Sequence, residues 1–195
     1  MIQTREDLKY YLEEDRKAYH KEKLTGLKAY IRDIVFPNYQ YEYIKNLRRW
    51  EYQFNTGGVL QYFYACRCER LKSKCGIDLQ PNIVGPGIHI VHGKVVINTF
   101  AKIGRNCKIL SDVTIGISGK KDQGDASVIG NNVYIGTGAK IFGGIHIGDN
   151  VRIGANCVVF EDVPDDATVV LQKPRTIIKP KDYNYYTFTI DERRY

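Results

Sequence analysis

The side chains in this sequence best suited to acid–base chemistry are its four histidines, at positions 20, 89, 92 and 146. Histidine titrates near neutral pH, so it can take a proton from a hydroxyl group, and a carboxylate on its second ring nitrogen would fix the tautomer and stabilise the imidazolium. His89 and His92 lie three positions apart in an extended stretch, which points them to opposite faces. Taken alone, such a histidine is more often a turn residue than a base.

The five cysteines are a second group of reactive side chains, at positions 66, 68, 75, 107 and 157. Their number is odd and they are widely spread, which is not typical of a disulfide framework. On a helix, the C-x-C-x6-C spacing of Cys66, Cys68 and Cys75 would point them to different faces, so we expect structural cysteines and no metal. With the polar start of the chain, this usage predicts a reducing, cytoplasmic location.

A repeat of six residues determines what must position these side chains. An aliphatic residue returns without a slip at positions 129, 135, 141, 147, 153 and 159, and upstream at 97, 103, 109 and 115. A helical face repeats at about 3.6 residues, a strand at about 2, and β-sandwich strands at about 8–12, so none of these fits. The pattern predicts a mainly β fold, a parallel β-helix, turning on Gly, Asn and Asp residues that tolerate a left-handed backbone.

One interval breaks the repeat. Ile115 and Ile129 are 14 positions apart, which we interpret as two hexads with two extra residues. The intervening segment, 117–128, has no packing reason to exist, and such extruded loops often carry function.

The first 75 residues have a different texture, rich in Tyr, Lys, Arg and Glu and poor in Gly. Apolar spacings of three and four predict short helices that start after Thr4, near residue 24, near Tyr39 and near Val59. We therefore divide the chain into an α-helical cap (1–75), a β-helix (76–178) and a C-terminal tail (179–195). The cap is expected to cover the open end of the coil and to assist oligomerisation.

The charge balance does not identify a partner. The formal net charge is +7 and the sequence pI is about 9.1, which suits an anionic ligand. A phosphorylated cofactor or an acidic glycan explains this charge as well as nucleic acid would. Because no long basic run or nucleic-acid motif accompanies the charge, we expect no nucleic acid as a partner. No run of 18 apolar residues is present, so no membrane insertion is expected.

Ordered motifs over about residues 75–178 resemble a known family. They are Asp78-Leu79-Gln80-Pro81, Ile90-Val91-His92-Gly93, Ala101-Lys102-Ile103-Gly104, Val113-Thr114-Ile115-Gly116, Ser118-Gly119-Lys120 and Ile135-Gly136-Thr137-Gly138-Ala139-Lys140. Together they resemble the serine-acetyltransferase-like branch of the hexapeptide-repeat acyltransferases. The resemblance implies a left-handed coil, acetyl-CoA as acetyl donor, and homotrimers with active sites between neighbouring helices.

The resemblance also implies roles for particular residues. His92 matches the family's general base and Asp78 the carboxylate that orients it. The pantetheine groove would be lined by Gly116, Ser118, Gly119, Thr137 and Ala155, and the CoA phosphates would meet Lys120, Lys173 and Arg175.

One departure from the family bears on the acceptor. Serine acetyltransferases carry an Arg-His pair after the Gly-Asp of the loop, whereas here Gly124-Asp125 is followed by Ala126 and Ser127. A carboxylate bound without its cation is expensive, so free serine fits poorly. We therefore expect a sugar hydroxyl as acceptor, in capsule, O-antigen or exopolysaccharide synthesis, with serine O-acetylation as the alternative.

Two other classes of β-helix protein stay open. A metal enzyme of the γ-type carbonic anhydrase kind needs about three convergent histidines, and His146 lies many coils beyond His92. A non-catalytic scaffold would need neither the extruded loop nor a pairing of Asp78 with His92.

Overall fold

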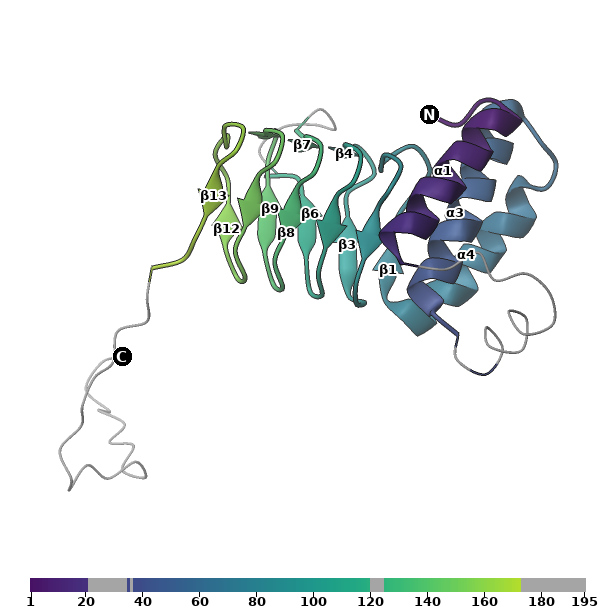
Figure 1. Cartoon of the computed structure of the whole chain (residues 1–195), viewed down its shortest axis with the longest axis horizontal. Helices are drawn as coiled ribbons and strands as arrows, with labels where there is room; N and C mark the ends of the chain where they lie inside the picture. Colours follow the sequence, from purple (N-terminus) through teal and green to yellow (C-terminus); the bar gives the residue numbers. More distant parts are fainter. Residues whose placement is uncertain (21–34, 36, 120–124, 173–195) are drawn as a thin grey trace, which may run out of the picture.

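The structure is a computed structural model that describes residues 1–20, 35, 37–119 and 125–172. A layer of helices covers one end of a coil of short strands, and the last described strand lies at the opposite end (Figure 1). The helix expected near residues 24–35 falls largely outside the described residues, and the tail 179–195 does so entirely.

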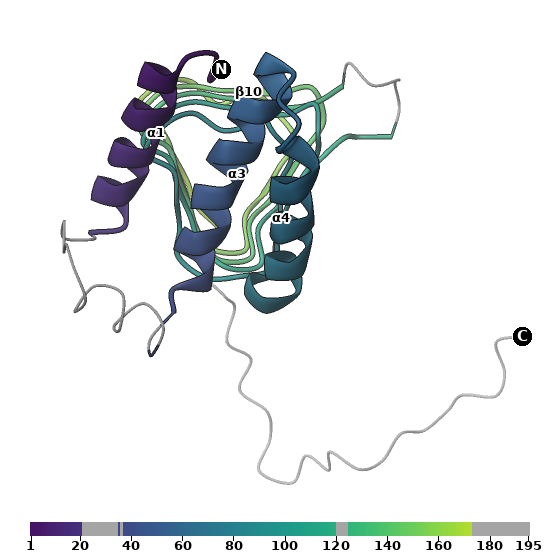
Figure 2. The same cartoon turned by 90° about the vertical axis from the view of Figure 1, so that its right-hand side faces the viewer.

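Three described helices form the cap: α1 (Arg5–Ala18), α3 (Tyr39–Thr56) and α4 (Gln61–Cys75). Helix α1 begins at a capping box, in which the Thr4 hydroxyl accepts from the Asp7 amide at 3.0 Å and the Asp7 carboxylate accepts from the Thr4 amide at 2.9 Å. Helices α3 and α4 end at Gly57 and Gly76, both in the left-handed conformation that glycine adopts without strain. Viewed along the coil, the three helices lie side by side across its end (Figure 2).

Thirteen short strands make the coil within the described residues. They are β1 (Ile77–Asp78), β2 (His89–Ile90), β3 (Val95–Ile97), β4 (Lys102–Ile103), β5 (Lys108–Ile109), β6 (Thr114–Gly116), β7 (Val128–Ile129), β8 (Tyr134–Ile135), β9 (Lys140–Phe142), β10 (His146–Ile147), β11 (Arg152–Ile153), β12 (Val158–Val159) and β13 (Thr168–Val169). All pairings are parallel, in three sheets ordered β1-β3-β6-β9-β12, β4-β7-β10 and β2-β5-β8-β11-β13. The parallel β-helix predicted from the six-residue repeat is confirmed.

The repeat works because each coil buries one aliphatic side chain per sheet. Ile109, Ile135 and Ile153 lie in register on successive coils, and each is fully buried. Lys108 and Arg152, which precede two of these residues in their strands, are exposed, which gives the alternation of exposed and buried residues.

Stacked polar residues hold the corner that leads into the third sheet. Asn106, Asn132 and Asn150 all have positive φ, as the turn residues of the sequence predict. Each donates to the next residue of the column, at 3.3, 3.0 and 2.8 Å, and Asp166 accepts the last of these bonds. The left-handed backbone and the amide ladder explain why Asn recurs at this corner.

The interval from Ile115 to Ile129 differs from its prediction. Ile115 lies in β6 and Ile129 in β7, which belong to adjacent faces of one coil, as do Ile141 and Ile147. The segment therefore spans one face and carries eight extra residues, not two, since six positions separate Ile141 from Ile147. A larger loop than expected leaves the coil here.

A buried ion-pair cluster fixes the cap to the coil. Arg48 of α3 is fully buried; its Nε donates to Asp15 of α1 at 2.8 Å, and its terminal nitrogens donate to the carbonyls of Val84 and Gly85 at 2.7 and 2.6 Å. Asp15 in turn accepts from the amides of Gly87 and Ile88. Cap and coil thus share one buried polar network.

Candidate active site

The residue predicted to orient the base, Asp78, lies where the cap joins the coil. It is the second residue of β1, and this strand begins immediately after the left-handed Gly76 that ends α4. Its Oδ2 lies 2.9 Å from Nζ of Lys72, which projects from the last turn of α4. Both side chains are partly exposed, so this cation and carboxylate pair is open to a ligand. The sequence analysis missed Lys72, although it lies only six residues before Asp78.

The predicted base, His92, occupies an exposed corner between β2 and β3. This corner stacks directly on the end of α4, because a Cβ placed on Gly93 would overlap the carbonyl oxygen of Cys75. Strand β3 then pairs with β1, with Val96 opposite Asp78. The coil therefore brings the His92 corner and the Asp78 strand to the same end of the same sheet. Among the described residues, Asp78 bonds to Lys72 and no Asp78–His92 hydrogen bond is formed.

Two predicted cofactor residues share the corner column of His92. Strands β2, β5, β8 and β11 are in register, so the second residue after each strand falls in one column: His92, Ser111, Thr137 and Ala155. Backbone bonds tie the column, including Asn156 N to Thr137 O at 2.8 Å and Gly138 N to Ser111 O at 2.9 Å. With coils about 4.8 Å apart, Thr137 and Ala155 lie roughly 10 and 14 Å along this edge from His92, and both are exposed.

The other predicted cofactor residues lie on a different corner. Gly116 ends β6, and Ser118 and Gly119 follow it where the extruded loop leaves the coil. A Cβ on Gly116 would lie 3.1 Å from the ring of Phe142, so the absent side chain makes room for that ring. One chain therefore does not bring the two groups of predicted residues together. Lys120, Lys173 and Arg175 lie outside the described residues.

The far end of the extruded loop is tied down by Asp125. Its carboxylate accepts from the Ser118 hydroxyl, from the Ser118 amide at 3.3 Å and from the Gly144 amide at 2.7 Å. The buried hydroxyl of Ser127 donates to the Gly143 carbonyl at 2.8 Å. Asp125 thus holds Ser118 beside a groove of about 660 Å³ lined by Ile117, Ser118, Asp125, Phe142, Gly143, Gly144, Ile145 and Phe160.

His89 has a different environment from His92. It lies in β2, half-buried, with its ring centroid 4.6 Å from that of Tyr19 and 6.3 Å from that of His20. Burial, with smaller effects of Lys108 and His20, lowers the pKa of His89 to about 4. A group that stays neutral and packed against the cap is a poor general base at neutral pH. His146 lies on β10 in another sheet, so these histidines do not converge.

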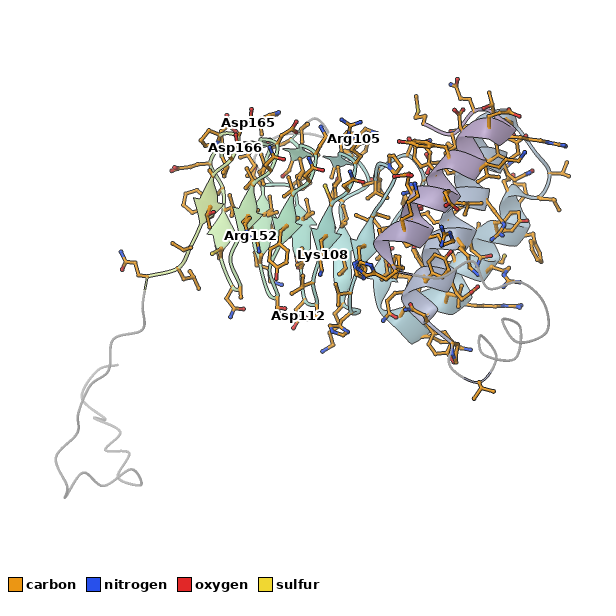
Figure 3. All side chains as sticks on the ribbon, viewed as in Figure 1. Arg105, Lys108, Asp112, Arg152, Asp165 and Asp166 are labelled. Carbon is orange, nitrogen blue, oxygen red and sulfur yellow. The ribbon has the colours of Figure 1, made fainter. Side chains whose placement is uncertain are left out.

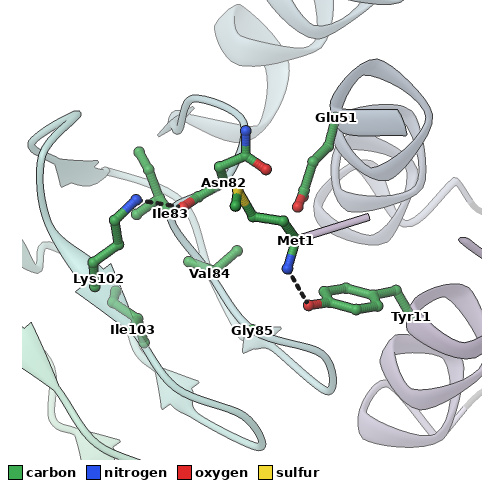
Figure 4. Close-up of a pocket in the computed structure, with 9 residues that line it drawn as sticks. All are labelled: Met1, Tyr11, Glu51, Asn82, Ile83, Val84, Gly85, Lys102 and Ile103. Atoms are coloured by element: carbon green, nitrogen blue, oxygen red, sulfur yellow. Dashed lines mark hydrogen bonds between the residues drawn. The ribbon is translucent and has the colours of Figure 1, made fainter. Parts of the chain in front are cut away.

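A second cavity lies between cap and coil, on the side of the chain's first residue (Figure 4). Its volume is about 280 Å³, and Met1, Tyr11, Glu51, Asn82 and Lys102 supply its polar lining, over an apolar floor of coil residues. The Met1 amino group donates to the Tyr11 hydroxyl at 3.3 Å, and Lys102 donates to the Asn82 carbonyl at 2.9 Å. None of the predicted site residues lines this cavity.

Figure 3 labels charged side chains on different parts of the coil. Lys108 and Arg152 project from one face, in register with Tyr134, whose ring lies 4.6 Å from the Arg152 guanidinium carbon. Asp112 lies on the edge that carries the His92 column, and Arg105 and Asp165 lie on another edge. Cations on the face beside the His92 edge suit an anionic ligand.

Within the part of the chain that the structure describes, no three His, Cys, Asp or Glu side chains gather into a group that could hold a metal ion. Cys68, Cys75, Cys107 and Cys157 are buried, and only Cys66 among the five is exposed. No helix in the described ranges is long and apolar enough to cross a membrane.

Comparison with known proteins gives consistent relatives. Residues 126–161 match the family described as bacterial transferase hexapeptide (six repeats). Serine acetyltransferase from Synechococcus elongatus is 38% identical over 139 residues, which are 70% of this chain and 55% of that protein. The chain thus spans about half the length of this curated relative.

Solved structures agree with the sequence relatives. The Neisseria gonorrhoeae serine acetyltransferase in complex with serine superposes with a TM-score of 0.66 at 31% identity, covering 87% of this chain and 69% of that one. The Brucella abortus serine acetyltransferase in complex with coenzyme A gives a TM-score of 0.68 at 27% identity, covering 84% and 65%. With the hexapeptide match, these neighbours confirm that the coil is a left-handed parallel β-helix.

These findings overturn the expected acceptor. The prediction of a sugar hydroxyl in capsule or other polysaccharide synthesis is wrong, because the relatives found are serine acetyltransferases. The error was to infer the acceptor from a missing Arg-His pair after Asp125. A substrate carboxylate can be bound by a cation from any element that reaches the site, and Lys72 lies at Asp78.

The chain therefore belongs to the hexapeptide-repeat transferase family, because its repeats match the family and because it aligns with most of the gonococcal structure.

Proposed function

We propose that this protein is an acetyl-CoA-dependent serine O-acetyltransferase, with His92 as general base and Asp78 as the carboxylate that orients it. The observation that carries the proposal is the shared column of His92, Thr137 and Ala155 along one edge of the coil. A base at one end and small exposed residues along the rest are what an extended thioester cofactor requires. The names of the relatives support the same reaction.

In the proposed reaction, His92 takes the proton of the serine hydroxyl while the hydroxyl oxygen attacks the thioester carbonyl. The tetrahedral intermediate then collapses, the C–S bond breaks, and the His92 imidazolium returns the proton to the departing CoA thiolate. O-acetylserine and CoA are the products. Base catalysis of this kind contributes about 10²- to 10⁴-fold to the rate.

Lys72 is the proposed cation for the serine carboxylate, in place of the Arg-His pair that is absent after Asp125. Its 2.9 Å contact with Asp78 supports this role, because it puts an ammonium group beside the carboxylate assigned to the base. When serine binds, its carboxylate takes over Lys72 and frees Asp78 to turn toward His92. The acceptor thereby assembles the pair that activates its own hydroxyl.

The active unit is proposed to be a homotrimer. The corner of His92 and the corner of Gly116 are separate within one chain, so a groove lined by both groups forms where one copy meets the next. Acetyl-CoA would lie in that groove, with Lys120, Lys173 and Arg175 proposed to meet its phosphates. Small-molecule substrates then reach three equivalent sites.

The test is CoA release from acetyl-CoA with L-serine as acceptor, for wild type, His92→Ala and Lys72→Met. His92→Ala should lower kcat by about 10²-fold or more. Lys72→Met should raise the KM for serine by about tenfold or more, since hydrogen bonds to charged groups contribute about 1.5–3 kcal/mol, and should leave the KM for acetyl-CoA unchanged. His146→Asn is the matched control, because His146 is exposed on another sheet.

Each result separates one part of the proposal from the rest. CoA binding without serine-dependent release would refute serine as acceptor, and full activity of His92→Ala would refute the assigned base. Absence of CoA binding by the wild type would leave a non-catalytic scaffold as the better interpretation.

A further inference from the structure

Two phenylalanines form an unusual pair on the corner that carries the extruded loop. Strands β9 and β12 pair with Ile141 opposite Val159, so Phe142 and Phe160 occupy the same position on successive coils. The preceding coils carry Asn98 and Gly116 at this position. Phe160 is 67% exposed, and Phe142 is half-buried with its ring over Gly116. An aromatic surface therefore begins where the small residues end.

This aromatic surface is part of a concave site. Both rings line the 660 Å³ groove, together with exposed Ile117 and the backbone of Gly143 and Gly144. Ser118 and Asp125 supply polar groups, and their mutual hydrogen bonds fix that wall. A hollow of this size that combines apolar side chains with a few ordered polar groups is typical of a small-molecule site.

We propose that Phe160, supported by Phe142, is the platform on which the adenine ring of acetyl-CoA stacks; this inference rests on the proposed function. The thiol end of the cofactor must lie at His92, which precedes β3. Phe142 ends β9 and Phe160 follows β12, two and three coils further along the same sheet and at its opposite edge from His92. In the proposed trimer, this edge of one copy meets the His92 edge of the next. At about 4.8 Å a coil the two rings lie roughly 10 and 14 Å along the axis from His92. The adenine end, separated from the thiol by the pantetheine arm, belongs at this distance.

The chemistry of the ring favours adenine over the other parts of the cofactor. A base presents a flat π-face, and stacking of bases on aromatic side chains is strong and needs no hydrogen-bond readout. The pantetheine arm and the pyrophosphate offer no such face. The exposed ring of Phe160, next to half-buried Phe142 in a concave site, is therefore best explained by the one planar group of the donor.

The experiment compares two donors that differ only in the adenine nucleotide. Steady-state kinetics are measured with acetyl-CoA and with acetyl-pantetheine for wild type and Phe160→Leu, a change that keeps apolar bulk and removes the aromatic face. Phe160→Leu should raise the KM for acetyl-CoA about tenfold, the scale of stacking one base on an aromatic ring, and leave the KM for acetyl-pantetheine unchanged. Calorimetry with CoA and pantetheine gives the same comparison without an acceptor.

Controls keep the inference distinct from the proposed function. Phe54→Leu, at an exposed ring of the cap, should change the KM for neither donor. If the wild type binds CoA and Phe160→Leu alters both donors equally, or neither, the platform is refuted while the proposed function stands. A change in oligomeric state of Phe160→Leu, measured by sedimentation, would also refute the platform and identify the ring as a contact between copies. If the wild type binds no CoA, both the platform and the proposed function are refuted.

Discussion

The buried Arg48 offers the sharpest test of how the cap is held on the coil. Its side chain and that of Asp15 have no exposed surface, and Glu51 is 2% exposed. The guanidinium donates to both carboxylates, at 2.8 Å to Asp15 and 3.3 Å to Glu51, and also to two carbonyls of the first coil. Arg48→Met keeps much of the volume but removes every one of these hydrogen bonds.

The magnitude follows from what Arg48→Met leaves behind. Removing one partner of a buried ion pair costs about 3–5 kcal/mol, because an uncompensated charge stays in a low-dielectric site. For a chain of about this size, each kcal/mol lowers the melting temperature by roughly 2–4 °C. We therefore expect Arg48→Met to lower Tm by about 6–20 °C. Two unsatisfied carbonyls of the first coil add to the loss.

Thermal unfolding followed by circular dichroism measures this loss. Arg49→Met, the adjacent residue of α3 with only a carbonyl contact at 3.3 Å, is the matched control and should lower Tm by about 2 °C or less. Neutralising the carboxylates as well, in Arg48→Met/Asp15→Asn/Glu51→Gln, should recover part of the loss. A Tm for Arg48→Met within the range of the Arg49→Met control would refute the view that this cluster joins cap to coil.

Three further predictions concern single side chains. Because burial lowers the pKa of His89 from its ordinary value near 6.5 to about 4, the unfolded chain binds this proton first. Its stabilising contribution is therefore present above pH 6.5 and lost as the pH falls toward 4, so His89→Gln should flatten the fall of Tm over that range relative to wild type. Cys66 is the exposed thiol, whereas burial raises the pKa of Cys68 to about 12 and of Cys107 to about 11; a thiol reagent should therefore modify one cysteine rapidly in the native protein, and Cys66→Ser should abolish that phase. Gly93→Ala introduces a Cβ onto the Cys75 carbonyl, so it should shift the His92 corner and lower kcat by about tenfold or more. Gly57→Ala, at the end of α3, meets no atom within 4 Å and strains only its own left-handed turn, so it is the control and should leave kcat unchanged. Equal activity of both variants would contradict the stacking of the His92 corner.

The fold was predictable because each six-residue period of the sequence corresponds to one face of the coil. Each aliphatic position of the repeat is a buried strand residue, and Asn132, Asn150 and Asn156 adopt the left-handed backbone that their slots suggest. The handedness could not be read this way, because the same inward and outward alternation would satisfy either hand. It required the resemblance and was confirmed by related structures.

The size of the extruded loop shows where period counting fails. Fourteen positions between Ile115 and Ile129 equal two hexads with a remainder, so the count alone could not tell one face from two. Pairing decides it, since β6 and β7 lie on adjacent faces of one coil. The spacing between two aliphatic residues of the repeat therefore gives the number of faces between them only when the sheet of each residue is known.

The candidate site was only half predictable for a related reason. Motifs locate His92 and Asp78 along the chain, but the neighbour of a carboxylate depends on packing, and the 2.9 Å contact with Lys72 arises because the last turn of α4 stacks on the first strand. Lys72 belongs to no motif, so an argument from motifs counted the missing Arg-His pair and overlooked the cation already present. Charge within reach of a site, and not charge at a motif position, determines whether a carboxylate can be bound there. In the proposed function, acceptor selection would therefore depend on the exchange of Lys72 between Asp78 and an incoming carboxylate.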